Sequence, residues 1–369
     1  MIRWALRSLA AEPLRLLGAA GGVAVAFTLV VFFEAVFEGE SQKIIAYPAH
    51  VDADVWVMQD GVANMHMATS MLWDWKRAVV EEIDGVERAT PILYTNAVVH
   101  AGGRPWFSYV VGLEPEARGA GPWEVAAGRP MPGPGEALLP RVVAQLAGVG
   151  LGDRVEILGR DLEVAGLTEG TFSMANSVTF VAMRDLEQLM DVASAYSYLL
   201  VRAEPDVSPE TLAGRIRTEL EDVNALPREE FLRNDHHLAV QMGVEVIWIM
   251  SLVSGLVAAL IVAFSCYTQV VHHRREFAVT KSLGFPNRGL LAAALLQAAA
   301  VSGLGLLGSV ALGFGLLPGI SALAPQISLV VLPEHYAPIA LGALAVTFAA
   351  SLLPAWAIAR VDPMTVFRG

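Results

Sequence analysis

Charged residues and cysteine are scarce in this chain. Only 17% of its 369 residues are charged, 54% are hydrophobic and one is cysteine. Soluble domains carry about 25% charged residues, so this composition nearly excludes a wholly soluble enzyme. The high hydrophobicity excludes a disordered chain, and one cysteine cannot form an intrachain disulfide or a CxxC metal site. The net charge of −12 argues against nucleic acid as a partner.

Lysine is also rare, and the motifs of nucleotide-binding and hydrolytic sites are missing. The lysines are Lys43, Lys76 and Lys281, and none follows a glycine, so the chain has no Walker A loop for a nucleotide phosphate. It also lacks HExxH and GxSxG. We therefore expect no catalytic residue, metal or cofactor in this chain, and expect a partner to bind any ATP and Mg²⁺ that the protein uses.

Four long uncharged runs predict a membrane protein. They cover residues 16–33, 246–271, 289–333 and 337–359, and a spanning helix needs about 20 apolar residues. The third run is too long for one span. Because prolines at 318, 325 and 333 follow its apolar first part, we expect a helix over 289–317 and a loop over 318–336. The first run is too long, and its flank too unlike a cleavage site, for a signal peptide.

The predicted organisation is therefore four transmembrane helices with one large external domain. We place the helices at 15–37, 244–271, 289–317 and 337–359, the external domain at 38–240, and a short interfacial helix at 1–14. Basic residues gather in the N-terminal segment, the 272–288 loop and the 360–369 tail, which predicts that these lie in the cytoplasm. Residues 38–240 contain 16 basic and 31 acidic residues and are expected outside an inner (plasma) membrane, in contact with its lipid.

The external domain combines strand and helix patterns, which predicts an α+β fold. Strand-like runs lie near 54–59, 95–100, 107–113, 154–158, 162–167, 178–181 and 198–202. Helix-like runs lie near 69–83, 140–148, 184–193 and 208–222, and the last begins with Ser208 as a cap and Pro209 in the first turn. We expect a small β-rich lobe inserted at about 130–180.

One segment of the external domain has side chains that suit a soft metal. Met65, His66 and Met67, with Met71 and His50, offer thioether and imidazole ligands for Cu(I). The alternative, which we favour, is a loop whose methionines pack in the core.

The loop at 272–288, HHRREFAVTKSLGFPNR, is basic and amphipathic. Its Leu283-Gly284-Phe285-Pro286 run is typical of a helix end. This pattern predicts a short helix over about 274–283 that docks into a groove on a partner. A charged loop that only orients the protein in the membrane is the alternative.

Three motifs, at 135–155, 275–284 and 359–368, resemble in their sequence and order those of the FtsX-like/MacB-type permeases of type VII ABC transporters. The stretch 275–284, REFAVTKSLG, is similar to the family's segment after the second span, and 359–368, ARVDPMTVFR, is similar to its C-terminal ending. In the external domain, GEALL at 135–139 followed by LGDRV at 151–155 resembles the periplasmic core of MacB. Residues 54–57 and 83–86 resemble the DevC-like branch.

The resemblance implies a permease subunit that lacks its own ATPase. Two such chains, as a homodimer, would pair with two ABC ATP-binding subunits, and a periplasmic adaptor is a possible further partner. ATP-driven motion would reach the external domain through the spans and move a lipid, lipoprotein, peptide or drug. The residues that would contact the ATPase are Arg274, Arg275, Glu276, Phe277, Val279, Lys281, Leu283, Gly284 and Phe285.

A second class of function remains open at this point. A membrane regulator that transmits ATPase motion to a periplasmic hydrolase or sensor would have the same topology and the same ATPase partner. Substrate-stimulated ATP hydrolysis favours the transporter, and a stoichiometric hydrolase partner favours the regulator.

Overall fold

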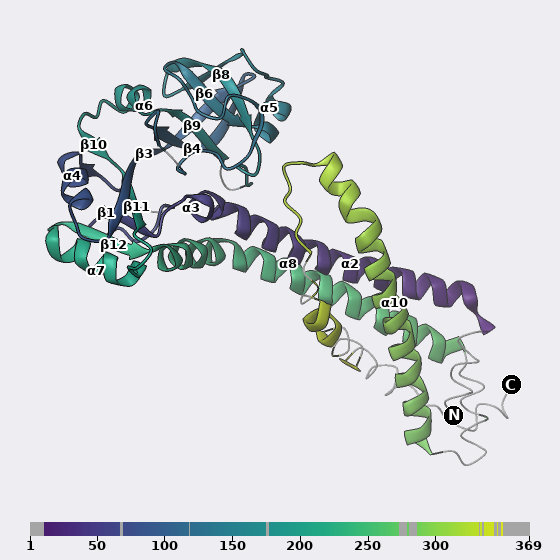
Figure 1. Ribbon diagram of the computed structural model, residues 1–369. Coiled ribbons are helices and arrows are strands. Elements are labelled where there is room, and N and C mark those ends of the chain that lie inside the picture. The colour runs from purple at the N-terminus through teal and green to yellow at the C-terminus, as the bar shows by residue number, and fades with distance from the viewer. Residues whose placement is uncertain are drawn as a thin grey trace. The chain divides into compact units, whose positions relative to one another are not determined.

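A computed structural model describes residues 11–66, 69–117, 119–174, 177–272, 279, 286–331, 333, 336–342, 345 and 348–349. The described residues form two compact units, whose elements are labelled in Figure 1. One unit, which we call the sheet unit, contains Glu40–Met242 and Pro325–Ser328. The other described residues form the helical unit.

The sheet unit contains a ten-stranded sheet of mixed direction. Its strand order is β12-β1-β11-β3-β4-β9-β6-β8-β5, and β7 pairs with β3 and β8. The β4–β9 and β6–β8 pairs are parallel, and the other pairs are antiparallel. The strands are β1 (Val55–Gln59), β3 (Val86–Ala101), β4 (Arg104–Leu113), β5 (Val125–Gly128), β6 (Glu136–Pro140), β7 (Arg154–Ile157), β8 (Arg160–Thr168), β9 (Ser177–Ala182), β11 (Tyr198–Ala203) and β12 (Val223–Pro227).

Part of this sheet closes into a ring. Because β7 pairs with both β3 and β8, strands β3, β4, β9, β6, β8 and β7 follow one another around a closed path. Its buried interior includes Leu93, Val99, Leu162 and Val164, and closure leaves few unpaired strand edges in this part of the unit. The long β3–β4 hairpin belongs both to the ring and to the rest of the sheet.

Strand β1 is buried on both faces because it lies between two cores. Val55 and Val57 point into a core that contains Leu212 and Ile216 of α7 (Pro209–Glu219). Trp56 and Met58 alternate to the other face, in a core of aromatic residues.

The remaining elements of the sheet unit are short. They are α3 (Ala46–His50), α4 (Trp75–Glu81), α5 (Arg141–Ala147), α6 (Met183–Met190) and a two-stranded sheet of β2 (Leu72–Trp73) and β10 (Ala195–Tyr196). The predicted cap of α7 is confirmed, since the Ser208 side chain accepts a hydrogen bond from the Thr211 amide at 3.3 Å. The α+β fold of the domain is confirmed, and each predicted strand overlaps an observed one. Helix α4 begins later than the predicted 69, because β2 occupies 72–73 and pairs with β10.

The described residues include three long helices. They are α2 (Pro13–Ile44), α8 (Arg228–His272) and α10 (Asn287–Leu323). By length and composition, Pro13–Ile44 and Leu295–Ile320 are apolar enough to cross a membrane. Helices α2 and α10 pack closely at two glycines: a Cβ on Gly305 would lie 2.4 Å from Val23, and one on Gly308 would lie 2.9 Å from Ala24.

The helix ends differ from the predicted spans. Helix α10 continues past 317 to Leu323, with Pro318 inside it. The helix can continue through Pro318 because a proline removes only one backbone N–H donor, so the helical hydrogen bonds of the neighbouring turns can still form. Helix α8 begins at Arg228, well before 244, because its first turns are amphipathic and bury Phe231 and Asp235 in the sheet unit. The interfacial helix predicted at 1–14 and the fourth span predicted at 337–359 lie largely outside the described residues.

Candidate functional site

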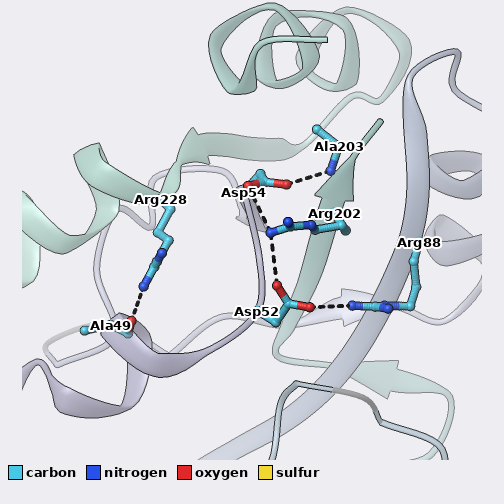
Figure 2. Close-up of polar contacts among 7 residues, drawn as sticks. All are labelled: Ala49, Asp52, Asp54, Arg88, Arg202, Ala203 and Arg228. Carbon is cyan, nitrogen blue, oxygen red and sulfur yellow. Dashed lines mark hydrogen bonds and ion pairs between the residues drawn. The ribbon is translucent and has the colours of Figure 1, made fainter. Parts of the chain in front are cut away.

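The predicted ATPase-coupling residues lie outside the described part of the chain, apart from Val279. They are Arg274, Arg275, Glu276, Phe277, Lys281, Leu283, Gly284 and Phe285. The structure therefore does not test that site. It shows a different candidate, at the place where α3 and α8 meet the sheet (Figure 2).

This place, which we call the junction, contains Ala49, Asp52, Asp54, Arg88, Arg202, Ala203 and Arg228. All of these residues belong to the sheet unit. The chain enters through α3 and residues 51–54 and becomes β1, and it leaves from β12 directly into α8 with no intervening loop. Strands β1 and β12 pair side by side, with Val55 opposite Pro227. The entering and leaving segments are therefore adjacent.

Arg228 joins the start of α8 to the entering segment in two ways. Its backbone amide, which has no partner within the helix because it is the first residue, donates to the Asp54 carbonyl oxygen at 2.9 Å. Its guanidinium donates to the carbonyl oxygen of Ala49, near the C-terminal end of α3. A carbonyl at a helix C-terminus is a good acceptor for a cation because it has no partner within the helix and carries partial negative charge.

Asp54 ties the entering segment to β11. Its carboxylate accepts a hydrogen bond from the Ala203 amide at 2.9 Å and forms an ion pair of 3.4 Å with Arg202. Its backbone amide donates to the Val201 carbonyl oxygen at 2.8 Å. Asp54 is therefore fixed through both its side chain and its backbone.

Asp52 extends the charged network to β3. One carboxylate oxygen lies 3.0 Å from Arg202 and the other lies 3.1 Å from Arg88 (Figure 2). The Asp52 side chain is half exposed, so each pair contributes at most about 1 kcal/mol by itself. Because two arginines from neighbouring strands share one carboxylate, the network fixes the position of the segment.

A second contact joins α8 to the sheet unit about two helical turns after Arg228. The Asp235 side chain is 0% exposed and accepts from the Met65 amide at 2.9 Å, the His66 amide at 3.3 Å and His66 Nδ1 at 3.0 Å. Its other oxygen, Oδ2, has no hydrogen-bond partner among the described residues. Phe231, four residues earlier on α8, stacks on Trp56 of β1 with ring centroids 4.3 Å apart.

The described residues of the segment proposed for Cu(I) make other contacts. Among the described residues, no three His, Cys, Asp or Glu side chains are placed to hold a metal ion. His66 faces Asp235, the His50 ring stacks on Trp123 at 4.2 Å, and Met65 is buried in the aromatic core. Met67 lies outside the described residues. The packing alternative fits these residues better than Cu(I) coordination.

Burial of the aromatic core raises the pKa of three tyrosines far above the ordinary value. Desolvation is the main cause for Tyr47, Tyr94 and Tyr198. For Tyr94 and Tyr198, the Tyr109 hydroxyl and the Asp235 carboxylate raise the pKa further. These groups therefore act as neutral packing and hydrogen-bonding residues.

No local pattern in the sequence predicts the junction. Arg202 and Arg228 lie 150 and 174 residues beyond the acidic pair that they contact, and only the pairing of β1 with β11 and β12 brings them together. The arrangement has no nucleophile or acid–base pair around a cavity. Chemically it can do one thing, which is to hold two helices rigidly against three strands.

Comparison with known proteins agrees with this architecture. Residues 16–219 match the family model of the MacB-like periplasmic core domain, and residues 248–363 match that of the FtsX-like permease C-terminal domain. The chain is similar to the uncharacterized ABC transporter permease Rv0072 of Mycobacterium tuberculosis, with 27% identity over 86% of this chain and 84% of the relative. It is also similar to the uncharacterized ABC transporter permease Mb2592 of Mycobacterium bovis, with 24% identity over the full length of both.

Two solved structures resemble part of the fold. The periplasmic region of MacB from Actinobacillus actinomycetemcomitans matches 52% of this chain and 97% of that structure, at 12% identity and a TM-score of 0.39. The extracellular domain of the noncanonic ABC-type transporter YknZ from Gram-positive bacteria matches 47% of this chain and 98% of that structure, at 13% identity and a TM-score of 0.38.

Proposed function

This chain belongs to the ABC transporter permeases of the MacB/FtsX type, and we propose that it transmits the motion of a separate ATPase to the sheet unit. A permease of this type implies an ATP-binding subunit as partner. Energy would come from ATP hydrolysis in that partner, since this chain has no Walker A loop.

One observation carries the proposal: α8 follows β12 at the junction without an intervening loop. Helix α8 follows Pro227 directly, and Arg228 joins it to Ala49 and Asp54. We expect a shift of the start of α8 to displace β12 and β1, because no loop separates Pro227 from Arg228.

The finer parts of the proposal rest on the sequence. We propose four spans, cytoplasmic termini and an external sheet unit, from the positions of the basic residues. We propose that residues 274–285, which are basic and amphipathic, contact the ATPase. Two copies of the chain would form a homodimer that exports or extracts its substrate.

A pull-down from native membranes in mild detergent tests the ATPase partnership. The tagged chain is expected to bring down an equimolar ATPase that contains a Walker A motif. Glu276→Arg and Phe277→Ala should each remove the ATPase from the eluate. Arg233→Gln, at an exposed position of α8 in the sheet unit, is the control that should retain it. Absence of any ATPase in several detergents would contradict the proposal.

The same preparation separates the transporter from the regulator. ATP hydrolysis that rises on addition of a substrate supports transport. An equimolar hydrolase that co-elutes with the chain and shows no substrate stimulation supports the regulator instead.

A further inference from the structure

A groove with two exposed tryptophans lies in the sheet unit, outside the junction. Its volume is about 1030 Å³, and its walls come from the end of β1, from β2 and α4, and from the turn between α7 and β12. We call it the tryptophan groove and define it by Asp60, Trp73, Trp75, Glu219, Glu221 and Asp222. A volume near the upper end of the range for ligand pockets fits a ligand of several residues.

The tryptophans are unusually open to solvent. Trp73 is 60% exposed and Trp75 is 56% exposed, although both are large apolar side chains that proteins normally bury. Met71, which also lines the groove, is 41% exposed. Tryptophan is enriched at binding sites because one rigid ring supplies a large contact area, and its face attracts cations.

The negative charge of the tryptophan groove favours a cationic ligand. Four carboxylates line the groove, and among the described residues none of the four forms an ion pair with a basic side chain. The lining cation, Lys76, is buried and donates to the backbone carbonyl oxygen of Glu221 at 3.0 Å. The groove therefore has a formal charge of −3 beside its indole rings.

The walls of the groove are already fixed in position. Lys76 joins α4 to the turn at 220–222, the Asp60 amide donates to the Asp222 carbonyl oxygen at 3.2 Å, and the Gln59 amide donates to Ser70 Oγ at 2.9 Å. A preformed site loses little conformational entropy when a ligand binds.

We propose that the tryptophan groove binds a short cationic peptide with apolar side chains. Its ammonium or guanidinium groups lie against the carboxylates and the Trp73 indole, since Lys76 Nζ already lies 5.7 Å from the centroid of the Trp75 ring. Its apolar side chains cover Trp73, Trp75 and Met71. A concave site of this size favours such a peptide over the face of a folded protein, since a stable protein interface needs about 800 Å² on each partner.

The strand register separates this groove from the junction. Gln59 pairs with Val223 at the groove end, and Val55 pairs with Pro227 at the junction end. These ends are about 13 Å apart along the strands. Peptide binding therefore leaves the junction free, and a failure of one proposal does not affect the other.

Binding of a defined probe to the full-length chain in neutral detergent micelles tests the proposal. The probe is a labelled hexapeptide of alternating lysine and leucine, followed by fluorescence anisotropy, with empty micelles as background. The unmodified chain should bind it above that background, and binding should weaken at high salt because exposed charges are screened.

Two double variants of the groove are compared with one matched control variant for their affinity for the probe. Glu219→Gln with Glu221→Gln should raise the Kd at least about tenfold, and Trp73→Ala with Trp75→Ala should do the same. The first pair changes only exposed side chains, so it tests the groove even where the tryptophan pair disturbs folding. Glu156→Gln with Glu163→Gln removes two exposed charges from β7 and β8 and should leave the Kd unchanged.

Three results would overturn the proposal. They are no binding above empty micelles, equal affinity in the groove variants and the control, and equally tight binding of a hexapeptide with glutamine in place of lysine.

Discussion

The backbone amide of Arg228 donates a hydrogen bond of 2.9 Å to the carbonyl oxygen of Asp54. The first residue of α8 is thereby joined to the residue that precedes β1. The Arg228 guanidinium joins the same helix to Ala49, and Arg202 joins Asp52 and Asp54 of the entering segment to β11. We therefore expect variants of the junction to disturb the connection between helices and sheet before they disturb the sheet itself.

Replacement of Asp54 should lower the unfolding free energy of the sheet unit, and the loss should be larger when more of its hydrogen bonds are removed. Asp54→Ala leaves the Ala203 amide without its acceptor and is expected to cost about 1–3 kcal/mol of unfolding free energy. Asp54→Asn keeps an acceptor oxygen and should cost less. Thermal unfolding of the full-length chain in detergent ranks the stability of the two variants. Asp161→Ala, at an exposed position of β8, is the control. Equal midpoints for Asp54→Ala and the control would contradict this account of the junction.

The contact between His66 and Asp235 should behave as a coupled pair. Removing one partner of a buried pair leaves the other unsatisfied, so Asp235→Ala is expected to cost about 3 kcal/mol. A double-mutant cycle with His66→Ala should give a coupling energy of at least about 1 kcal/mol. Additive effects of the two substitutions would show that the pair contributes nothing beyond its separate packing.

The buried tyrosines predict loss of stability at alkaline pH. Burial raises the pKa of Tyr47, Tyr94 and Tyr198 in the folded state, so the folded chain retains these protons where the unfolded chain releases them. Their contribution is complete below pH of about 10, the pKa of an unfolded tyrosine, and is lost as pH rises above it. Absorbance at 295 nm should show some of the seven tyrosines ionising only as the near-ultraviolet circular dichroism disappears. A single ionisation of all tyrosines near pH 10, with the dichroism intact, would contradict the burial.

Local patterns in the sequence predicted the cap of α7 and strands β1, β3, β4, β7, β8, β9 and β11, but not β2, β5, β6, β10 or β12. The strand-like run at 162–167 predicted β8, and Ser208-Pro209 predicted the start of α7. Closure of the ring through β7 was not predictable, because it depends on pairing with β3 more than 50 residues earlier. The end of α10 was misplaced because a single proline was read as a helix end.

The candidate site was harder to predict than the fold for the same reason. His66 suggested a metal ligand by its local neighbours, but its partner Asp235 is 169 residues away on α8. The junction likewise depends on residues from β3, β11 and α8 that no local pattern connects.

The central claim is that a direct connection between α8 and β12 transmits motion. Inserting Gly-Ser-Gly between Pro227 and Arg228 replaces that connection with a flexible one. The most direct measurement is the distance between spin labels on the two copies of a Glu163→Cys chain, in a Cys266→Ser background and in complex with the ATPase. We predict that ATP shifts this distance in the uninterrupted chain, and that the insertion removes the shift while the ATPase stays bound. An equal shift with and without the insertion would contradict the account.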